Sequence, residues 1–273
     1  MKLPHSDPPT AESILGSRDY NASVGAFKHI VSDLMVGSSF HSGVHLLRPL
    51  LDLTCRGRPH CVYAEVGSFC GASMALALSF PGVTHAISIS PPERRTLCMG
   101  LNETSALARN VECLNVHGAN FTHIPHISDS SGPSLKRALG GRRVDVFVID
   151  GCHALRCVFR DFTHFAPFVR PGGVLLMDDY GDPSSSGVRA GVHKIKRRFC
   201  AEADPANATF ARLAEFSCIG ALPNVAGASR TCGYDAGGLW KGCTGADMVP
   251  PEFSNEYLIV KRSHRHISHA RSR

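Results

Sequence analysis

Short apolar runs alternate with segments of helical periodicity along most of this chain. The predicted strands are apolar runs bounded by glycine or acidic residues, at 61–66, 84–89, 111–117, 144–149 and 173–177. The predicted helices, in which apolar residues recur at helical spacing, lie at 26–53 with a break near Gly37, and at 72–80, 94–110, 134–139 and 187–199. A glycine-rich region at 201–249, with one hairpin near 216–222, precedes a final strand at 256–261.

Strands that alternate with helices predict a parallel sheet, because each helical crossover returns the chain to the same edge of the sheet. We therefore predict an α/β fold built on a single doubly wound, mostly parallel sheet with helices on both faces. No internal repeat or long linker divides the chain. The expected organisation is a loose N-terminal segment at 1–25, one domain at 26–262 and a basic, disordered tail at 263–273.

Composition places the chain among globular proteins: of its 273 residues, 43% are hydrophobic and 19% are charged. No apolar run reaches the roughly 18 residues that span a bilayer, and the N-terminus lacks the apolar core of a signal peptide. We therefore expect a cytoplasmic protein with no membrane span. The 11 cysteines, an odd number without zinc-finger spacing, are expected to be reduced thiols that pack as small hydrophobes.

The net charge of +6 is concentrated in the last residues, KRSHRHISHARSR. We interpret this stretch as a solvated tail in preference to a contact with RNA, an acidic glycan or a membrane surface. Because the remainder is close to neutral, nucleic-acid binding is not expected. The oligomeric state stays open, with a homo-oligomer among the alternatives.

Acidic residues follow two of the predicted strands directly. Asp150 comes after the strand at 144–149, and Asp178 and Asp179 come after the next. Each has an ordinary alternative, a helix cap for Asp150 and a solvated turn for the pair. Neighbouring parallel strands deliver their carboxyl ends to one edge, where ligands of α/β sheets bind, and this convergence favours a metal site. Carboxylate oxygens suit Mg²⁺, Mn²⁺ or Ca²⁺ rather than zinc.

His153 lies three residues after Asp150. A lone histidine near a strand end is often only a polar filler or cap. Beside a metal site, however, a side chain with a reference pKa near 6.5 is suited to act as a general base. The remaining histidines of this region are expected at the surface or in loops: His117, His123, His126 and His164.

A glycine motif, Glu65-Val-Gly67-Ser68-Phe-Cys-Gly71, ends the first predicted strand. Gly67 allows a tight turn and a close approach to a ligand, and Gly71 allows the next helix to pack closely. Glu65 could accept hydrogen bonds from a ligand amine or hydroxyl. The spacing differs from the dinucleotide pattern G-x-G-x-x-G, which argues against a nicotinamide cofactor.

Three segments together resemble the class I S-adenosylmethionine-dependent methyltransferases: AEVGSFCGASMALAL, VIDGCHALRCVFRDFTHFAPFVRPGGVLLMDDY and DDYGDPSSSGVRAGVHKI. The resemblance covers about 40–261. It is closest to the metal-dependent small-molecule O-methyltransferases of macrolide-sugar and cephalosporin pathways, and more distant to the catechol type. It implies a Rossmann-like methyltransferase domain with a seven-stranded sheet. It also implies methyl transfer to a hydroxyl of a sugar or other small molecule, with Mg²⁺ or Mn²⁺ held by Asp150, Asp178 and Asp179 and His153 as base.

The resemblance also implies an S-adenosylmethionine site, formed by Glu65, Gly67, Ser68, Gly71, Ser90, Asn120 and Asp150. Two positions depart from the family pattern. Ser90 stands where an acid that binds the ribose is expected, and Ala119 stands where the third strand is often followed by Gly-Asp, which leaves Asn120 as the adenine contact. These departures keep open a degenerate methyltransferase fold that serves as a non-catalytic binding or scaffold module. Hydrolysis or phosphoryl transfer is least supported, because there is no P-loop.

Overall fold

The computed structural model describes residues 44–91, 97–98, 101–180, 185–199, 210–215 and 257–261. The predicted loose segment, most of the helical region at 26–53, the hairpin near 216–222 and the basic tail lie outside the described residues.

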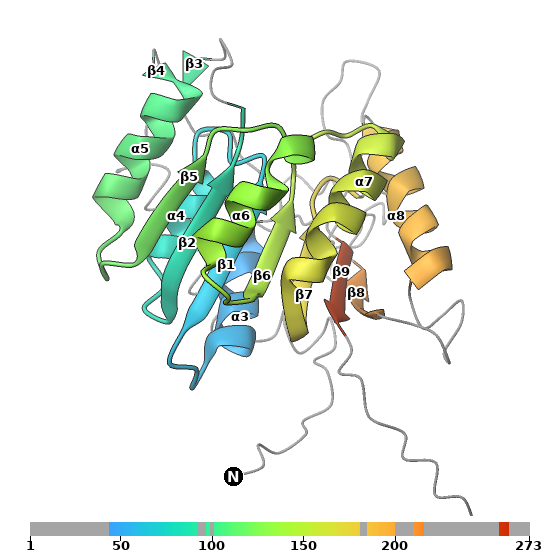
Figure 1. The fold of residues 1–273 in the computed structure, drawn as a ribbon, viewed down its shortest axis with the longest axis horizontal. Helices are drawn as coiled ribbons and strands as arrows, with labels where there is room; N and C mark the ends of the chain where they lie inside the picture. The colour runs from blue at the N-terminus through green and yellow to red at the C-terminus, as the bar shows by residue number, and fades with distance from the viewer. Residues whose placement is uncertain are drawn as a thin grey trace, which may run out of the picture.

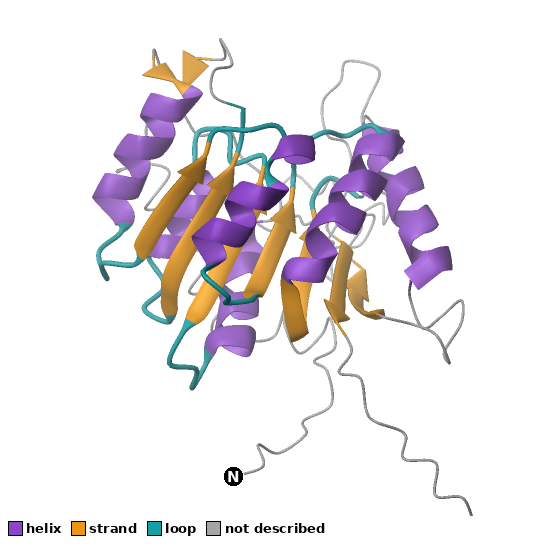
Figure 2. Ribbon diagram, in the orientation of Figure 1, coloured by secondary structure: helices purple, strands orange, loops and turns teal. Residues whose placement is uncertain are grey.

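A seven-stranded sheet forms the centre of the molecule, in the order β5-β2-β1-β6-β7-β9-β8 (Figures 1 and 2). Its strands are β1 (Cys61–Val66), β2 (Val83–Ile89), β5 (Asn120–Ile124), β6 (Val144–Ile149), β7 (Val169–Met177), β8 (Phe210–Glu215) and β9 (Tyr257–Lys261). The first five are parallel, and β9 runs antiparallel between β7 and β8. The predicted doubly wound, mostly parallel sheet is confirmed.

Helices cover both faces of the sheet (Figure 1). One face packs against α3 (Val44–Cys55), α4 (Ala72–Leu78) and α5 (Glu103–Leu114). The other packs against α6 (Gly132–Leu139), α7 (Leu155–Phe165) and α8 (Ser186–Phe199). The short elements are the strand pair β3 (Leu97–Cys98) and β4 (Leu101–Asn102), and the 3₁₀ turns η2 (Ser128–Ser130) and η3 (Ala166–Phe168). No helix among the described residues has both the length and the apolar character that crossing a bilayer needs.

The apolar runs become strands because both of their faces are buried. Every residue of β1 and of β6 is buried, with alternate side chains in the two cores. Tyr63 points to the core under α3 and α4, whereas Val62 and Ala64 point to the core under α6 and α7. Strands that are buried on both sides have near-continuous apolar sequences, which explains why the sequence reveals them clearly.

The predicted third strand at 111–117 is wrong. The helix α5 continues to Leu114, because Leu107, Val111 and Leu114 recur at helical spacing and are all buried in the same core. The side chain of Asn115 stabilises the turn that follows: its Nδ2 donates to the carbonyl oxygen of Ala119 at 2.7 Å, and its Oδ1 accepts the N–H of Ala119 at 2.8 Å. The strand β5 follows this turn, from Asn120, and most of its residues are only partly buried, so its apolar signal is weak.

Two disulfides also contradict the prediction of reduced thiols. Cys55 at the end of α3 is bonded to Cys61 at the start of β1, with 5.3 Å between their Cα atoms. Cys152 is bonded to Cys157 on α7, with 5.6 Å between their Cα atoms. The sequence does not reveal these pairs, because the turns between the cysteines bring them together.

Candidate active site

A cavity of about 390 Å³ lies at the carboxyl edge of the sheet. Its walls are residues that follow β1, β2, β5 and β6, together with the first turns of α5 and α7. In Figure 1 the strand arrows of the parallel strands point to this edge, and α5 begins beside it. Ligands of α/β sheets bind at this edge, so the cavity has the expected location for a substrate or cofactor site.

Gly67 is the point at which the strand ends meet. Its N–H donates to the carbonyl oxygen of Ile89 at 2.9 Å, and the N–H of Asp150 donates to that of Val66 at 2.9 Å. Its φ of 95° is left-handed, and a Cβ at this position would overlap the carbonyl oxygen of Asp150. Only glycine fits this junction, which agrees with the predicted tight turn and close approach.

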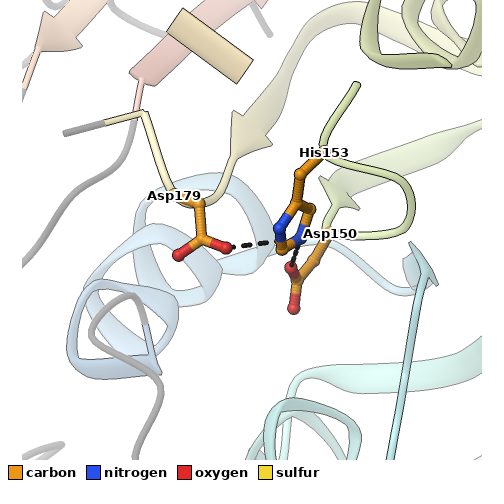
Figure 3. A group of neighbouring side chains, drawn as sticks. All are labelled: Asp150, His153 and Asp179. Carbon is orange, nitrogen blue, oxygen red and sulfur yellow. Dashed lines mark ion pairs between the residues drawn. The ribbon is translucent and has the colours of Figure 1, made fainter. Parts of the chain in front are cut away.

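His153 lies between two carboxylates that come from different strand ends (Figure 3). Its Nε2 is 3.5 Å from Oδ1 of Asp150 and 3.3 Å from Oδ2 of Asp179. One ligand atom from each of the three residues lies within 4.8 Å of the other two. This spacing would allow one cation to contact all three.

The loop that carries His153 is held from two sides. The disulfide between Cys152 and Cys157 joins it to the first turn of α7. On the other side Ser185, which precedes α8, places its Oγ 3.3 Å from Nδ1 of His153. Gly187 approaches so closely that a Cβ there would overlap the His153 carbonyl oxygen. These contacts hold the imidazole with its Nε2 toward the carboxylates.

Asp178 and Asp179 follow β7 directly and have different environments. Asp178 is buried, its N–H donates to the carbonyl oxygen of Ile149 at 3.1 Å, and its Oδ1 accepts the N–H of Asp179 at 2.8 Å. Asp179 has a φ of 59°, which is uncommon for a residue other than glycine, and its carboxylate lies beside His153. The geometric cluster is thus Asp150, His153 and Asp179, with Asp178 close behind it.

The charges of this group influence one another. Burial raises the pKa of Asp150 well above its usual value, and the nearby carboxylates of Asp178, Asp179 and Glu65 raise it further. A divalent cation would remove this repulsion, and carboxylate oxygens are the ligands that Mg²⁺ and Mn²⁺ prefer. The donor set therefore fits a hard divalent cation.

Of the predicted cofactor residues, Gly67, Ser90 and Asp150 line the cavity. Ser90 is buried at the end of β2, and its Oγ is 3.1 Å from Nε2 of His123. His123, expected at the surface, is instead half-buried in β5, and burial lowers its pKa. The lowered pKa favours the neutral imidazole of His123 as the hydrogen-bond partner of the Ser90 hydroxyl.

The other predicted cofactor residues of the glycine motif lie behind the cavity wall. Glu65 is buried, and its Oε2 accepts hydrogen bonds from Tyr63 and, at 2.7 Å, from Ser73 of α4. Ser68 is buried, with its Oγ 2.7 Å from that of Ser88. Gly71 opens α4, and a Cβ there would lie 2.7 Å from Leu107 of α5, as expected for close helix packing.

Asn120 lies at the opposite end of the sheet. It is the exposed first residue of β5 and pairs with His85, near the start of β2. The expected contact between Asn120 and adenine assumed that Asn120 follows the third strand. Because Asn120 instead begins β5, that assumption does not hold. The residues that follow β5 and line the cavity are His126, Ile127, Ser128 and Asp129.

Two buried carboxylates in the cavity wall were not among the site residues predicted from the sequence. Glu103, the first residue of α5, is 6% exposed, and Asp161 of α7 is 1% exposed. Burial raises the pKa of Asp161. A signal for Asp161 existed, since it lies beside Val158, Phe162 and Phe165 on the apolar face of its helix. Glu103 had no such signal, because an acid in the first turn of a helix is ordinary.

Comparisons with known proteins agree with this architecture. Residues 64–180, from β1 to the end of the acidic cluster, match the family model of a methyltransferase domain. The chain is 31% identical over 168 residues to the uncharacterized protein R132 of Acanthamoeba polyphaga mimivirus, which covers 60% of this chain and 72% of the relative.

The chain belongs to the class I S-adenosylmethionine-dependent methyltransferases. Solved structures with the same fold include the O-methyltransferase from Bacillus cereus in complex with SAH, with a TM-score of 0.50 and 12% identity over 92% of this chain and 94% of that one. Cofactor-bound Rv0187 from MTB has a TM-score of 0.51 and 12% identity, over 95% of this chain and 99% of that one. The predicted membership in the class I methyltransferases is confirmed, and Figure 1 shows the order of the strands in this chain.

Proposed function

We propose that this protein is a divalent-metal-dependent O-methyltransferase that transfers the methyl group of S-adenosylmethionine to a hydroxyl of a small molecule, such as a sugar. The observation that carries the proposal is the meeting of Asp150, His153 and Asp179 at the carboxyl edge of a methyltransferase sheet. Carboxylates that hold a cation and an imidazole that takes a proton are groups suited to activating a hydroxyl acceptor.

The cavity supports binding of the cofactor. Its volume of about 390 Å³ falls within the range of small-molecule sites, ~300–1,000 Å³. The Bacillus cereus protein of the same fold is described in complex with SAH. We expect the methionine part near Gly67 and the nucleoside toward the ends of β2 and β5.

The acidic cluster would hold the cation through Asp150 and Asp179, with Asp178 behind them. A bound divalent cation supplies a Lewis acid that lowers the pKa of a coordinated hydroxyl. The protein residues orient the acceptor beside the methyl group, and such positioning accounts for much of the rate in bimolecular reactions.

His153 accepts the proton of the acceptor hydroxyl at Nε2. The contact between Nδ1 and Ser185 leaves Nε2 directed at the cluster, and the two carboxylates within 3.5 Å stabilise the imidazolium that forms. In the proposed transfer, the bond from the methyl carbon to the sulfur of S-adenosylmethionine would break as a carbon–oxygen bond to the acceptor forms. The products are S-adenosylhomocysteine and a methyl ether, and the proton stays on His153 until it passes to solvent.

A turnover assay with a panel of sugars and catechols, read as S-adenosylhomocysteine formation, tests the proposal. We expect activity with one class of hydroxyl acceptor, its loss in excess EDTA and its return with Mg²⁺ or Mn²⁺. Activity that survives EDTA would overturn the role of the metal. Calorimetry with S-adenosylmethionine separates an enzyme from a scaffold module, since a scaffold without a cofactor site would show no binding at millimolar ligand.

A further inference from the structure

On the β2 side of the cavity, one carboxylate has a buried oxygen that receives no hydrogen bond from the described residues. Glu103 is 6% exposed, and its buried Oε1 makes no hydrogen bond to the part of the chain that the structure describes. Its side chain lines the same cavity as Ser90 and Phe69. A buried carboxylate in such a position is unfavourable unless donors are provided from elsewhere.

Helix capping does not account for Glu103. An acid in the first turn gains from the helix dipole, but this gain is small beside the penalty of burying an unpaired carboxylate. The capping role is already filled, because Oδ1 of Asn102 accepts the N–H of Ser105 at 2.8 Å. The donors that satisfy Glu103 are therefore expected to come from a ligand.

Ser90 by itself offers few hydrogen-bond acceptors to a ligand on this side of the cavity. It ends β2 with an uncharged hydroxyl that is already engaged by His123 at 3.1 Å. A ribose carries two adjacent hydroxyls, and a carboxylate can accept hydrogen bonds from both at once, whereas a serine hydroxyl cannot match that capacity. A nucleoside in this cavity would thus need a second acceptor near Ser90.

The other acids of the cavity are less suited to this task. Asp129 is 42% exposed at its side chain and pairs with Arg160 at 2.6 Å. Asp161 lies under the loop after β6, with Oδ2 3.6 Å from the position of a Cβ on Gly151, and it comes from α7, on the opposite face of the sheet from α5. Glu103 instead comes from α5, whose first turn lies at the same edge as the carboxyl ends of β2 and β5 (Figure 1).

We propose that Glu103 binds the ribose hydroxyls of S-adenosylmethionine, with Ser90 beside it, and so replaces from a helix the acid that the end of β2 lacks. This inference rests on the proposed function, because it requires the cavity to bind the cofactor.

Calorimetry with S-adenosylhomocysteine and its 2′-deoxy, 3′-deoxy and deaminated analogues tests the proposal on the full-length protein. We expect Glu103→Gln to weaken S-adenosylhomocysteine binding by about 10- to 100-fold, the loss typical of a hydrogen bond to a charged group. Removal of a ribose hydroxyl should weaken binding to the wild type, but should have little further effect on the variant. Glu112→Gln, at an exposed position of the same helix, should bind like the wild type.

Three outcomes would overturn the proposal. If Glu103→Gln binds S-adenosylhomocysteine as the wild type does, Glu103 has no role in binding. If the variant loses sensitivity to the deaminated analogue instead of the deoxy analogues, Glu103 binds the amine and not the ribose. If the wild type itself shows no binding, the proposed function fails as well. Thermal unfolding of both variants checks that a weak ligand response is not a loss of fold.

Discussion

Acidic side chains occur at both edges of the sheet, but their surroundings differ. At the amino edge Asp145 is fully buried, accepts the N–H of Val62 at 2.9 Å and pairs with Arg170 and, at 2.9 Å, with Arg58. At the carboxyl edge Asp150 lies among other carboxylates, and among the described residues the basic side chain paired with it is His153. Two arginines neutralise the structural acid, whereas the acids at the carboxyl edge lie close to one another, as expected if they bind the proposed cation.

This difference distinguishes an acid that stabilises the fold from acids that are placed to bind a ligand. A buried acid with two arginines and a backbone donor is satisfied within the chain, so its removal should affect folding alone. Acids that repel one another lower the stability of the metal-free protein, and such groups are retained at sites that bind something. Each prediction below changes one edge and compares the result with the other.

The largest effect on stability is expected from Asp145→Ala. It leaves Arg170, whose side chain is only 18% exposed, without its carboxylate, and the free energy of unfolding should fall by about 3–5 kcal/mol. Chemical denaturation measures this change. Asp52→Asn, which breaks the α3 pair between Asp52 and the 72% exposed Arg56, should cost less than about 1 kcal/mol. A similar loss from both variants would contradict the structural role of Asp145.

The largest effect on activity is expected from His153→Ala. Loss of the base should lower kcat by about 10²- to 10⁴-fold, while S-adenosylhomocysteine affinity and the unfolding midpoint stay near the wild-type values. Steady-state kinetics and calorimetry measure the two quantities, and His117→Ala, at an exposed position, is the control. Unchanged turnover would remove His153 from the mechanism. Mn²⁺ titration should show retained metal binding, whereas its loss would make His153 a ligand instead.

The disulfides Cys55–Cys61 and Cys152–Cys157 provide a matched pair, one at each edge. Replacing Cys152 and Cys157 with serine should lower the free energy of unfolding by about 2 kcal/mol and should also reduce kcat several-fold, because the loop of His153 loses its tie to α7. Replacing Cys55 and Cys61 should lower stability similarly without a change in kcat. Equal effects of both pairs on kcat would show that the carboxyl-edge disulfide does not position the base.

The smallest effect is expected from Asp150→Asn in metal-free protein. Because the folded state raises the pKa of Asp150, the folded protein binds this proton more tightly than the unfolded chain does. Wild-type stability should therefore fall as the pH rises from about 4 through the folded pKa. The variant should lack this slope and unfold about 2–4 °C higher near neutral pH, if the gain is about 1 kcal/mol. Mg²⁺ should stabilise the wild type only; a variant that unfolds earlier would contradict the repulsion.

The sequence was most informative where function is local in the chain. Asp150 and His153 are three residues apart, and Asp178 and Asp179 follow the next strand, so parallel pairing of β6 and β7 was enough to bring them together. The glycine at position 67 was likewise evident from its place after a buried strand. In contrast, the position of β5 was predicted wrongly, because its side chains are only partly buried. Asn120 was therefore expected after the carboxyl end of this strand, whereas it is the first residue of the strand.

The sequence by itself determined most of the parallel strands and the acids at their ends, because apolar runs buried on both faces and strand-end acids are patterns of neighbouring residues. Tertiary structure alone decided that Cys152 meets Cys157, that Glu65 faces α4 and that Glu103 faces the cavity. An acid in the first turn of a helix looks the same in sequence whether solvent or a cavity surrounds it. Its burial, and therefore its need for a ligand donor, depends on elements distant in the chain.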